Sequence, residues 1–222
     1  KTNEAEEGIL KLLHSSQDKK LFEHYLKIVQ AEDSNVYPGS PVISRAFLRP
    51  QDRLWLSELH PEDFQQLTHL FHKDPQVKVL HQDGYLSLKS LLPPKEKRGL
   101  ILIDPPFEER NEFKTLVNGL RESYKRFSTG IYMIWFPIKD LKPIKEFYTA
   151  LRGLEIPKIL TIEFLRSPPT TSETLNGTGL VIVNPPWKIQ EKIIPGLEVL
   201  LKIFEFKEGY TRSEWLREEG KN

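Results

Sequence analysis

Hydrophobic and polar positions divide the chain into a short helical part and a longer alternating part. Within residues 1–36, apolar residues recur at helix-like spacing, and the polar stretch 14–18 interrupts them. This pattern predicts two short helices in a small hairpin, which we interpret as a helical insertion subdomain. From residue 37 to residue 222, short apolar runs alternate with longer amphipathic stretches, as strands alternate with helices.

The predicted strands are residues 53–59, 77–80, 99–103, 130–136, 158–165 and 179–183. The predicted helices are residues 61–73, 85–92, 111–127 and 141–151. A further helix is expected near Ser40, which would act as its N-cap, with Pro41 at the first helical position.

Two of these strands are apolar at every position, residues 100–103 and 180–183. Such runs are typical of strands buried on both faces of a parallel sheet, so the pattern predicts an α/β fold. No helix pattern separates the last two predicted strands. We therefore expect them to pair antiparallel near the sheet edge, and we interpret the charged segment from about Lys188 as a surface helix or extension.

Composition and charge exclude several classes of protein. Of 222 residues, 38% are hydrophobic and 28% are charged, which is typical of a soluble globular protein. No apolar run approaches the roughly 20 residues that a membrane span needs. The chain has no cysteine, which excludes disulfide scaffolds and thiolate zinc sites and fits a cytoplasmic location. The net charge of +1 argues against a nonspecific polyanion binder but permits a local basic patch.

The most specific chemical signal is the Asp-Pro-Pro-Phe motif at residues 104–107, directly after an apolar strand. Ligands of open α/β sheets bind beyond the carboxyl ends of strands. Two prolines stiffen the loop, so the Asp104 carboxylate and the Pro105 carbonyl are held as acceptors beside the Phe107 ring. Acceptors beside a stacking face suit a planar ligand with an exocyclic amino group, such as adenine. The alternative is a Pro-Pro turn with an aspartate helix cap.

A second, similar motif, Asn-Pro-Pro-Trp, occupies residues 184–187. We interpret it as a loop that stops an edge strand. The alternative is a wall of the substrate pocket.

Acidic residues also follow the two earlier strands. Glu58 closes the first, where a carboxylate can accept hydrogen bonds from ribose hydroxyls, or can cap the next helix. Asp83 and Gly84 follow the second, where the carboxylate can contact an adenine amino group and glycine permits close approach, although a turn is the alternative.

Other polar groups give weaker signals. Four histidines lie between residues 60 and 81, and two of them, His69 and His72, stand three residues apart. No acidic residue or third ligand follows at an established metal spacing, so we expect no metal site. Basic residues near the third strand are candidate phosphate contacts, although charge runs usually form solvated faces. They are Lys95, Lys97, Arg98, Lys125 and Arg126.

Together these motifs resemble the RlmJ family, the 23S ribosomal RNA adenine-N6 methyltransferases. The resemblance is carried by residues 37–41, 57–61, 83–84, 98–107, 124–137 and 181–188. It implies a Rossmann-like S-adenosylmethionine-dependent methyltransferase fold with a small helical insertion, and a seven-strand order whose last strand is antiparallel. It also implies cofactor or active-site contacts, with Asp104 as the catalytic residue. By position these contacts fall on Ser40, Glu58, Asp83, Gly84 and Asp104.

One departure from the family is large. Its Gly-rich loop and first strand are not in this sequence, so we expect the 222 residues to be part of a longer protein. The implied activity is N6-methylation of an adenine in 23S ribosomal RNA, with protein-free RNA as the expected partner. The alternatives are DNA adenine-N6 methylation, and a nucleic-acid-binding protein linked to use of external DNA as a nutrient.

Overall fold

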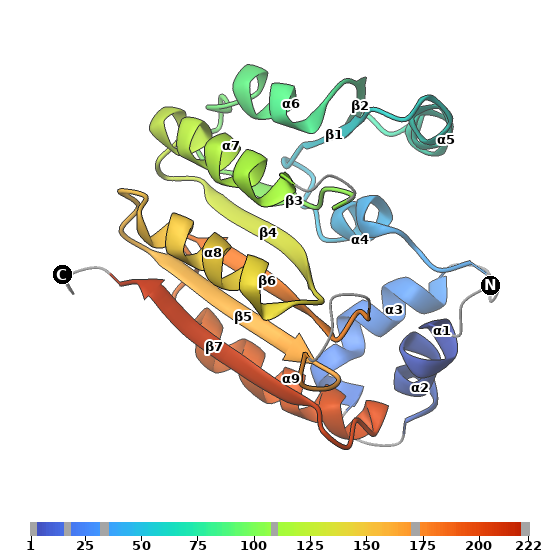
Figure 1. Ribbon diagram of the computed structural model, residues 1–222. Coiled ribbons are helices and arrows are strands. Elements are labelled where there is room, and N and C mark those ends of the chain that lie inside the picture. The colour runs from blue at the N-terminus through green and yellow to red at the C-terminus, as the bar shows by residue number, and fades with distance from the viewer. Residues whose placement is uncertain (1–3, 16–18, 32–35, 108–110, 170–173, 219–222) are drawn as a thin grey trace. The chain divides into compact units, whose positions relative to one another are not determined.

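The computed structural model describes residues 4–15, 19–31, 36–107, 111–169 and 174–218. Contacts along the chain group it into two compact units. One consists of Lys1–Leu12 and Leu91–Asn222, and the other is Leu13–Ser90. Figure 1 gives the labels of the helices and strands. Within the described ranges, no helix is both long and apolar enough to cross a membrane.

The Leu13–Ser90 unit is built on a pair of parallel strands. β1 (Leu54–Glu58) and β2 (Val77–His81) run side by side from the pair Leu54–Val77 to the pair Glu58–His81. The helix α5 connects them, and α6 follows β2. The helical elements here are η1 (Lys19–Phe22), α3 (Glu23–Ala31), α4 (Ser40–Ala46), α5 (Pro61–Phe71) and α6 (Gly84–Ser90). α2 (Ile9–His14) spans the boundary of the two units.

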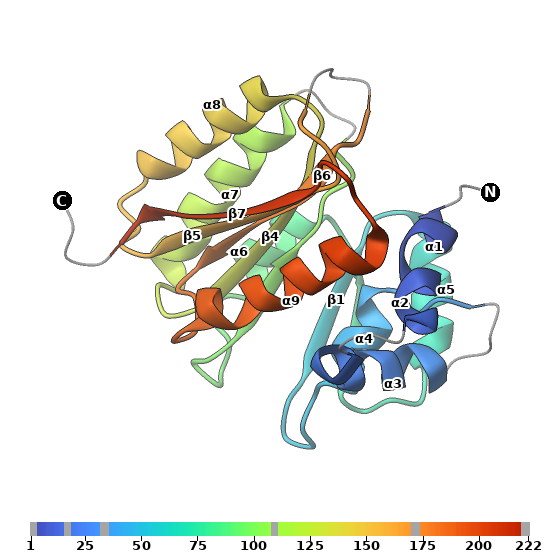
Figure 2. The same ribbon diagram turned by 90° about the horizontal axis from the view of Figure 1, so that it is seen from below.

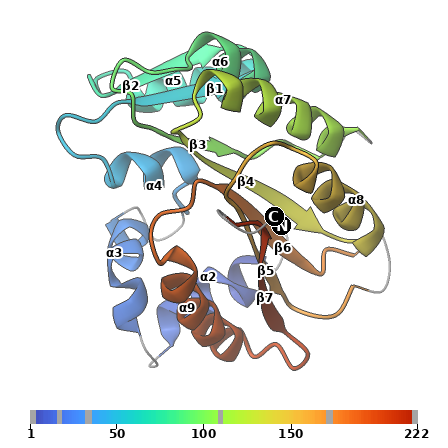
Figure 3. The ribbon, with the colours of Figure 1, turned by 90° about the vertical axis from the view of Figure 1, so that its left-hand side faces the viewer.

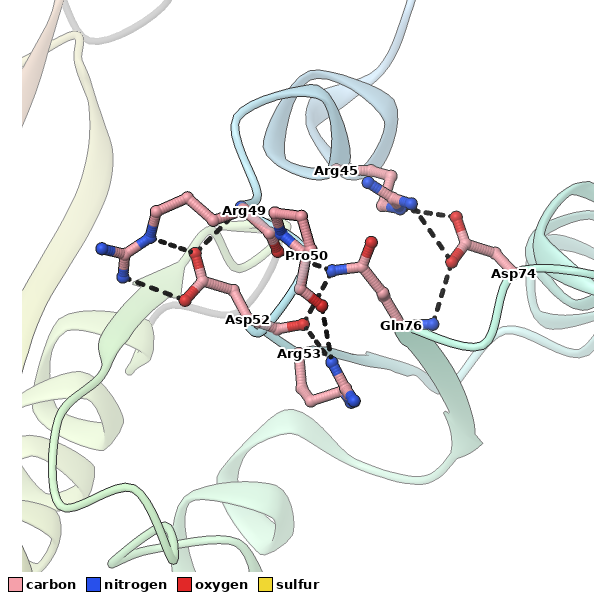
Figure 4. Close-up of polar contacts among 7 residues, drawn as sticks. All are labelled: Arg45, Arg49, Pro50, Asp52, Arg53, Asp74 and Gln76. Carbon is pink, nitrogen blue, oxygen red and sulfur yellow. Dashed lines mark hydrogen bonds and ion pairs between the residues drawn. The ribbon is translucent and has the colours of Figure 1, made fainter.

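A polar network fixes the segment between α4 and β1 against the residues that enter β2 (Figure 4). Arg45 Nε lies 2.5 Å from an oxygen of Asp74, and the pKa of that carboxyl is lowered by the hydrogen bond from the guanidinium. Gln76 Nε2 donates to the carbonyls of Arg49 (2.7 Å) and Asp52 (2.9 Å). Because these bonds pair main-chain acceptors of a loop, they give this polar segment a defined path.

The larger unit contains a five-stranded sheet in the order β3-β4-β6-β5-β7. β3 and β4 are parallel, whereas the pairs β4–β6, β5–β6 and β5–β7 are antiparallel. The strands are β3 (Leu100–Ile103), β4 (Ile131–Ile138), β5 (Ile159–Leu165), β6 (Gly177–Val183) and β7 (Tyr210–Arg217). The helices are α1 (Glu4–Glu7), α7 (Glu112–Arg126), α8 (Leu141–Arg152) and α9 (Ile189–Phe204).

Helices cover both faces of this sheet, with α7 and α8 on one face and α9 on the other (Figures 2 and 3). The burial of β4 alternates along its whole length, so its even-numbered residues enter the α7/α8 core. Phe136 in that core meets the edge of Phe147 from α8 at 5.6 Å. On the opposite face, α9 packs Ile189, Ile193 and Leu197 against the buried cluster Leu160, Ile162 and Ile182.

Most predicted elements are confirmed with ends shifted by a few residues, and the antiparallel pairing of β5 with β6 is confirmed. The expected cap is wrong: Gly39 is the N-cap of α4, and Ser40 is already helical. The expected edge position is also wrong, because β6 lies between β4 and β5. The segment after Lys188 forms α9 and then the strand β7, which the charged pattern did not indicate.

The two strands predicted from uniformly apolar runs, β3 and β6, differ in their burial. β6 is antiparallel but interior, and its last three residues are buried. In β3, Leu100 is 60% exposed and Leu102 is 42% exposed, so this strand is not buried on both faces as expected. Its one partner among the described residues is β4.

Gly179 provides a test of the core. A Cβ at this position would lie 2.1 Å from the Phe136 ring, which has no room to move in a closely packed face. We expect Gly179→Ala to lower the free energy of unfolding by about 1–3 kcal/mol, measured by urea denaturation. The control is Gly153→Ala, where the nearest contact would be an ordinary 3.4 Å. Equal stability of the two variants would contradict this account.

Candidate active site

The Asp-Pro-Pro-Phe motif lies at the carboxyl end of the parallel pair β3–β4. β3 ends at Ile103, which pairs with Ile134, and Asp104 follows directly. Pro105 and Pro106 cannot donate backbone hydrogen bonds, so the chain leaves the sheet there. Asp104 is accessible to solvent, and no described residue donates a hydrogen bond to its carboxylate. The sequence prediction that this loop follows a strand is therefore confirmed.

Phe107 has an unusual backbone conformation. Its φ is 53°, in the left-handed region that residues with a Cβ rarely occupy. The partly buried ring lies 5.2 Å from Phe113 and 6.0 Å from Trp135, measured between centroids. Such conformations cost about 1–3 kcal/mol and are held by their surroundings. Here the aromatic contacts hold Phe107 beside Asp104, and part of the ring remains accessible.

Trp135 is a site residue that the sequence reasoning missed. The register Ile103–Ile134 places it on β4 at the level of Asp104, and its ring meets Phe107 at an interplanar angle of 69°. It is partly exposed, unlike its buried neighbours Ile134 and Phe136. A tryptophan between Ile134 and Phe136 in an apolar strand was the available signal, but its pairing with Phe107 depends on the fold.

The surroundings of Asp104 disfavour its charged form. Although the residue is accessible, neighbouring atoms of the chain remove part of its water, and this desolvation raises the pKa of Asp104 above the ordinary aspartate range. A raised pKa makes the ionised carboxylate a stronger hydrogen-bond acceptor than that of an ordinary aspartate. It also means that ionisation of Asp104 lowers folding stability as the pH rises from its unfolded-state pKa through its folded-state pKa.

A second group of candidate residues lies at the carboxyl ends of β1 and β2. The pair Glu58–His81 closes that parallel sheet, so Glu58 lies at the same edge as Asp83 and Gly84, where α6 begins. One Glu58 oxygen accepts the backbone N–H of His60 at 2.7 Å, and Asp83 Oδ1 accepts that of Leu86 at 2.9 Å. Both carboxylates thus support a helix start. The alternative interpretation expected this for Glu58, whereas for Asp83 it expected a turn. Each carboxylate has a second oxygen.

Gly84 and Ser40 are also exposed. A Cβ placed on Gly84 would have no heavy atom within 4 Å, so packing within the described chain does not require glycine there. This open space fits a ligand that approaches the backbone closely. Ser40 begins α4, the helix whose Arg45 is bound to Asp74.

The basic candidates lie at the opposite edge of the five-stranded sheet from Asp104. Lys95, Lys97 and Arg98 precede β3, while Lys125 and Arg126 end α7 before β4. This edge is separated from the level of Asp104 by about 13 Å, which is four residues of strand. Their role as phosphate contacts stays a prediction, and it concerns a surface away from Asp104.

The Asn-Pro-Pro-Trp motif also lies at this opposite edge. β6 runs antiparallel to β4, so Asn184 leaves the sheet beside the start of β4. Its side chain donates to the carbonyls of Ser128 (2.7 Å) and Gly130 (2.8 Å). Asn184 therefore fixes the turn before β4, and the motif does not line the Asp104 site.

Metal ligation finds no support among the residues described: no group of three or more His, Asp or Glu side chains is placed to hold one ion. His69 and His72 stack on each other with centroids 5.6 Å apart. His81 stacks on Phe64 and shares a hydrogen bond with the Leu59 carbonyl.

The fold and site define a class of protein. Acidic residues follow successive parallel strands of an α/β chain, and an Asp-Pro-Pro-Phe loop offers acceptors beside an aromatic ring. These features define a methyltransferase of the Rossmann-like class.

Comparison with known proteins identifies the family. The family model described as "Ribosomal RNA large subunit methyltransferase D, RlmJ" matches residues 1–217. The chain belongs to this family, as the resemblance implied.

Similar proteins include curated relatives and a solved structure. The chain is 37% identical to "Ribosomal RNA large subunit methyltransferase J" of Escherichia coli, over 97% of this chain and 79% of the relative. It is 37% identical to the protein of the same name from Haemophilus influenzae, over 91% of this chain and 74% of the relative. The crystal structure of protein LPL1258 from Legionella pneumophila has a TM-score of 0.88 and 36% identity, covering 97% of this chain and 82% of that one.

The raised pKa of Asp104 generates a prediction about pH. Protonation removes an acceptor, so we expect kcat/KM for methyl transfer to fall as the pH decreases through the Asp104 pKa, starting at a higher pH than an ordinary aspartate would give. The measurement is a pH–rate profile of the protein.

The control is a measurement of stability in Asp104→Asn. Because the raised pKa makes the ionised group unfavourable in the folded state, this variant should be at least as stable as the parent at neutral pH and should lose that advantage in acid. An acid limb at the ordinary aspartate pKa would refute the assignment.

Proposed function

We propose that this protein transfers the methyl group of S-adenosylmethionine to the N6 amino group of an adenine in large-subunit ribosomal RNA. The observation that carries the proposal is the Asp104 carboxylate, whose pKa is raised, at the end of β3 in one loop with Phe107, whose backbone is left-handed. Family membership and the names of the E. coli and H. influenzae relatives support the substrate.

The residues of the loop orient the amino group. The Asp104 carboxylate and the Pro105 carbonyl accept hydrogen bonds from the two N–H groups of N6. Phe107 stacks on the adenine ring. This arrangement turns the nitrogen lone pair, otherwise delocalised into the base, toward the methyl group. Positioning of this kind contributes several kcal/mol to lowering a barrier. Trp135, steeply inclined to Phe107, forms a side wall that limits rotation of the base.

The cofactor supplies a methyl group activated by a positive sulfonium sulfur. Transfer to N6 would form an N–C bond at the expense of the C–S bond, leave a neutral thioether and release one N6 proton to water, so the balance would need no metal. Asp104 accepts the hydrogen bond that increases electron density on N6 as this proton becomes acidic. Its role is alignment and charge stabilisation, for which a raised aspartate pKa is suited.

The residues at the ends of β1 and β2 fit the cofactor by their chemistry. The second oxygen of Glu58 can accept from ribose hydroxyls, and that of Asp83 from an adenine amino group. Gly84 leaves space for close approach, and the Ser40 hydroxyl adds a donor and acceptor. These four residues are the proposed cofactor contacts of the Leu13–Ser90 unit, and Asp104 is the proposed contact of the larger unit.

The target adenine must leave its stack to reach Phe107. Extrusion costs a few kcal/mol, and least where the base is already unpaired. We therefore infer that the substrate is protein-free 23S ribosomal RNA, in which the target is accessible. We further propose that the protein acts in the cytoplasm and without a metal. Lys95, Lys97, Arg98, Lys125 and Arg126 are the proposed contacts to RNA phosphates beyond the reacting base.

Methyl transfer is the direct test. We expect the protein, with labelled S-adenosylmethionine, to label naked large-subunit ribosomal RNA as N6-methyladenine. Asp104→Ala should lower kcat about 100-fold or more, because alignment supplies several kcal/mol. Phe107→Tyr is the matched control, since it keeps the stacking face and should retain activity.

Genomic DNA offered in parallel separates the alternatives. Label in DNA alone would replace the RNA proposal with DNA adenine methylation. The absence of both cofactor binding and label in either nucleic acid would leave a nucleic-acid-binding role with a vestigial site. Full activity of Asp104→Ala would refute the mechanism.

Gly84 tests the cofactor site. A larger side chain there has space within the described chain, so Gly84→Leu should fold normally but obstruct the ligand. We expect its Kd for S-adenosylmethionine to rise about tenfold or more, since steric overlap costs about 1–3 kcal/mol. Calorimetric titration measures the affinity, circular dichroism checks the fold, and Gly84→Ala should show a smaller effect. Unchanged affinity in Gly84→Leu would remove Gly84 from the site.

A further inference from the structure

Trp187 is the most exposed of the large hydrophobic residues that the structure describes, at 85% of its accessible surface. It belongs to the Asn-Pro-Pro-Trp motif, which the proposed chemistry at Asp104 does not use. Single exposed apolar residues are common on proteins. An indole held almost completely in solvent by a stiff loop, however, presents an open aromatic surface to a partner.

The loop that carries Trp187 is held by main-chain contacts at both ends. The Asn184 side chain binds the turn before β4, and its backbone N–H donates to the Lys158 carbonyl at 3.1 Å. The Pro186 carbonyl accepts a hydrogen bond at 3.1 Å from the backbone N–H of Ile189, the first residue of α9. Left-handed conformations at Asn184 (φ 51°) and Lys188 (φ 59°) flank the two prolines. The indole is therefore presented by a preorganised loop.

Basic residues converge on the same edge of the sheet. The Gly99 carbonyl accepts from Ile131, so Lys97 and Arg98 lie where β4 begins. Lys125 and Arg126 lead directly into the turn that Asn184 binds. Lys188 Nζ lies 6.0 Å from the Trp187 ring centroid.

Acidic residues offset part of this charge. Lys125 pairs with Glu122 at 2.9 Å and Lys188 with Glu191 at 3.6 Å. These side chains are at least half exposed, and exposed ion pairs contribute little stability, so a phosphate can displace a carboxylate at low cost.

We propose that this edge of the sheet is a docking surface for an unpaired segment of the RNA substrate, in which a base stacks on Trp187. We call it the Trp187 surface, and it consists of Trp187, Lys188, Lys97, Arg98, Lys125 and Arg126. The proposal rests on the proposed function, because it concerns how that enzyme holds RNA.

The chemistry favours RNA over other occupants. An aromatic face among exposed cations is the combination that binds single-stranded nucleic acid, through base stacking and phosphate attraction. A protein interface or a second copy would need a contiguous apolar patch, whereas Trp187 lies between Pro186 and Lys188 in the chain, with the Lys188 Nζ 6.0 Å from its ring centroid. An unpaired segment is required because paired bases do not expose their faces.

The distance from the reacting base defines what this surface does. It lies at the amino end of β4, about 13 Å along the strands from the level of Asp104. A few nucleotides of single strand span this separation. The surface therefore contributes to holding the RNA and not to the transfer step, so its removal should raise KM and leave kcat unchanged.

The test compares RNA binding and methyl transfer in matched variants. We expect Trp187→Ala to raise the Kd for an unpaired RNA oligonucleotide about 5- to 100-fold, as stacking contributes about 1–3 kcal/mol per base. Trp187→Phe should retain most of the affinity. The control is Trp55→Ala, because Trp55 is 48% exposed and also has a lysine Nζ over its ring, Lys78 at 4.8 Å.

Salt dependence separates stacking from charge. Trp187→Ala should lower affinity with an unchanged slope of log K against log salt. The double variant Lys97→Gln, Arg98→Gln should reduce the slope by about 0.7 for each RNA phosphate that it no longer neutralises.

Three outcomes would overturn the proposal: an unchanged Kd in Trp187→Ala, an equal reduction of affinity in Trp55→Ala, or a fall in kcat at constant KM. Each is interpretable while the parent protein methylates RNA. Absence of RNA methylation by the parent would instead refute the proposed function itself.

Discussion

The position of β4 controls the arrangement of the larger unit. It pairs with β3 in parallel on one side and with β6 antiparallel on the other. The parallel partner delivers the Asp-Pro-Pro-Phe loop to the carboxyl edge, and the antiparallel partner delivers the Asn-Pro-Pro-Trp loop to the amino edge. Two motifs of nearly the same sequence therefore lie at opposite edges, because strand direction decides the edge at which each one leaves the sheet.

The two edges also differ in their electrostatics. At the carboxyl edge, partial desolvation raises the pKa of Asp104, and aromatic rings lie close to it. At the amino edge, Lys188 lies near the exposed indole of Trp187, and further lysines and arginines lie at the ends of β3 and α7 on the same side. A partly desolvated acceptor suits the alignment of one amino group, whereas solvated cations suit a polyanion whose exact position matters less. Separating them keeps the cations from lowering the pKa of the Asp104 carboxylate.

Both loops hold residues in left-handed conformations, but at different positions. In the first, Phe107 itself is left-handed and its ring rests on Phe113 and Trp135. In the second, Asn184 is left-handed and its amide binds two main-chain carbonyls, leaving Trp187 in solvent. The prolines stiffen each loop, and the contacts around them decide whether the aromatic ring is packed or presented.

The sequence alone determined the α/β class, most helices and strands, the family and the position of Asp104 after β3, because hydrophobic period and proline-rich loops are local signals. It did not determine that β6 is interior, that the charged tail contains β7, or that Leu100 and Leu102 are exposed, since these depend on which strands become neighbours. The same limit applies to Trp135 and Trp187. Tertiary pairing alone put one indole against Phe107 and the other at the basic edge, because register and strand direction are set by packing between segments far apart in the chain.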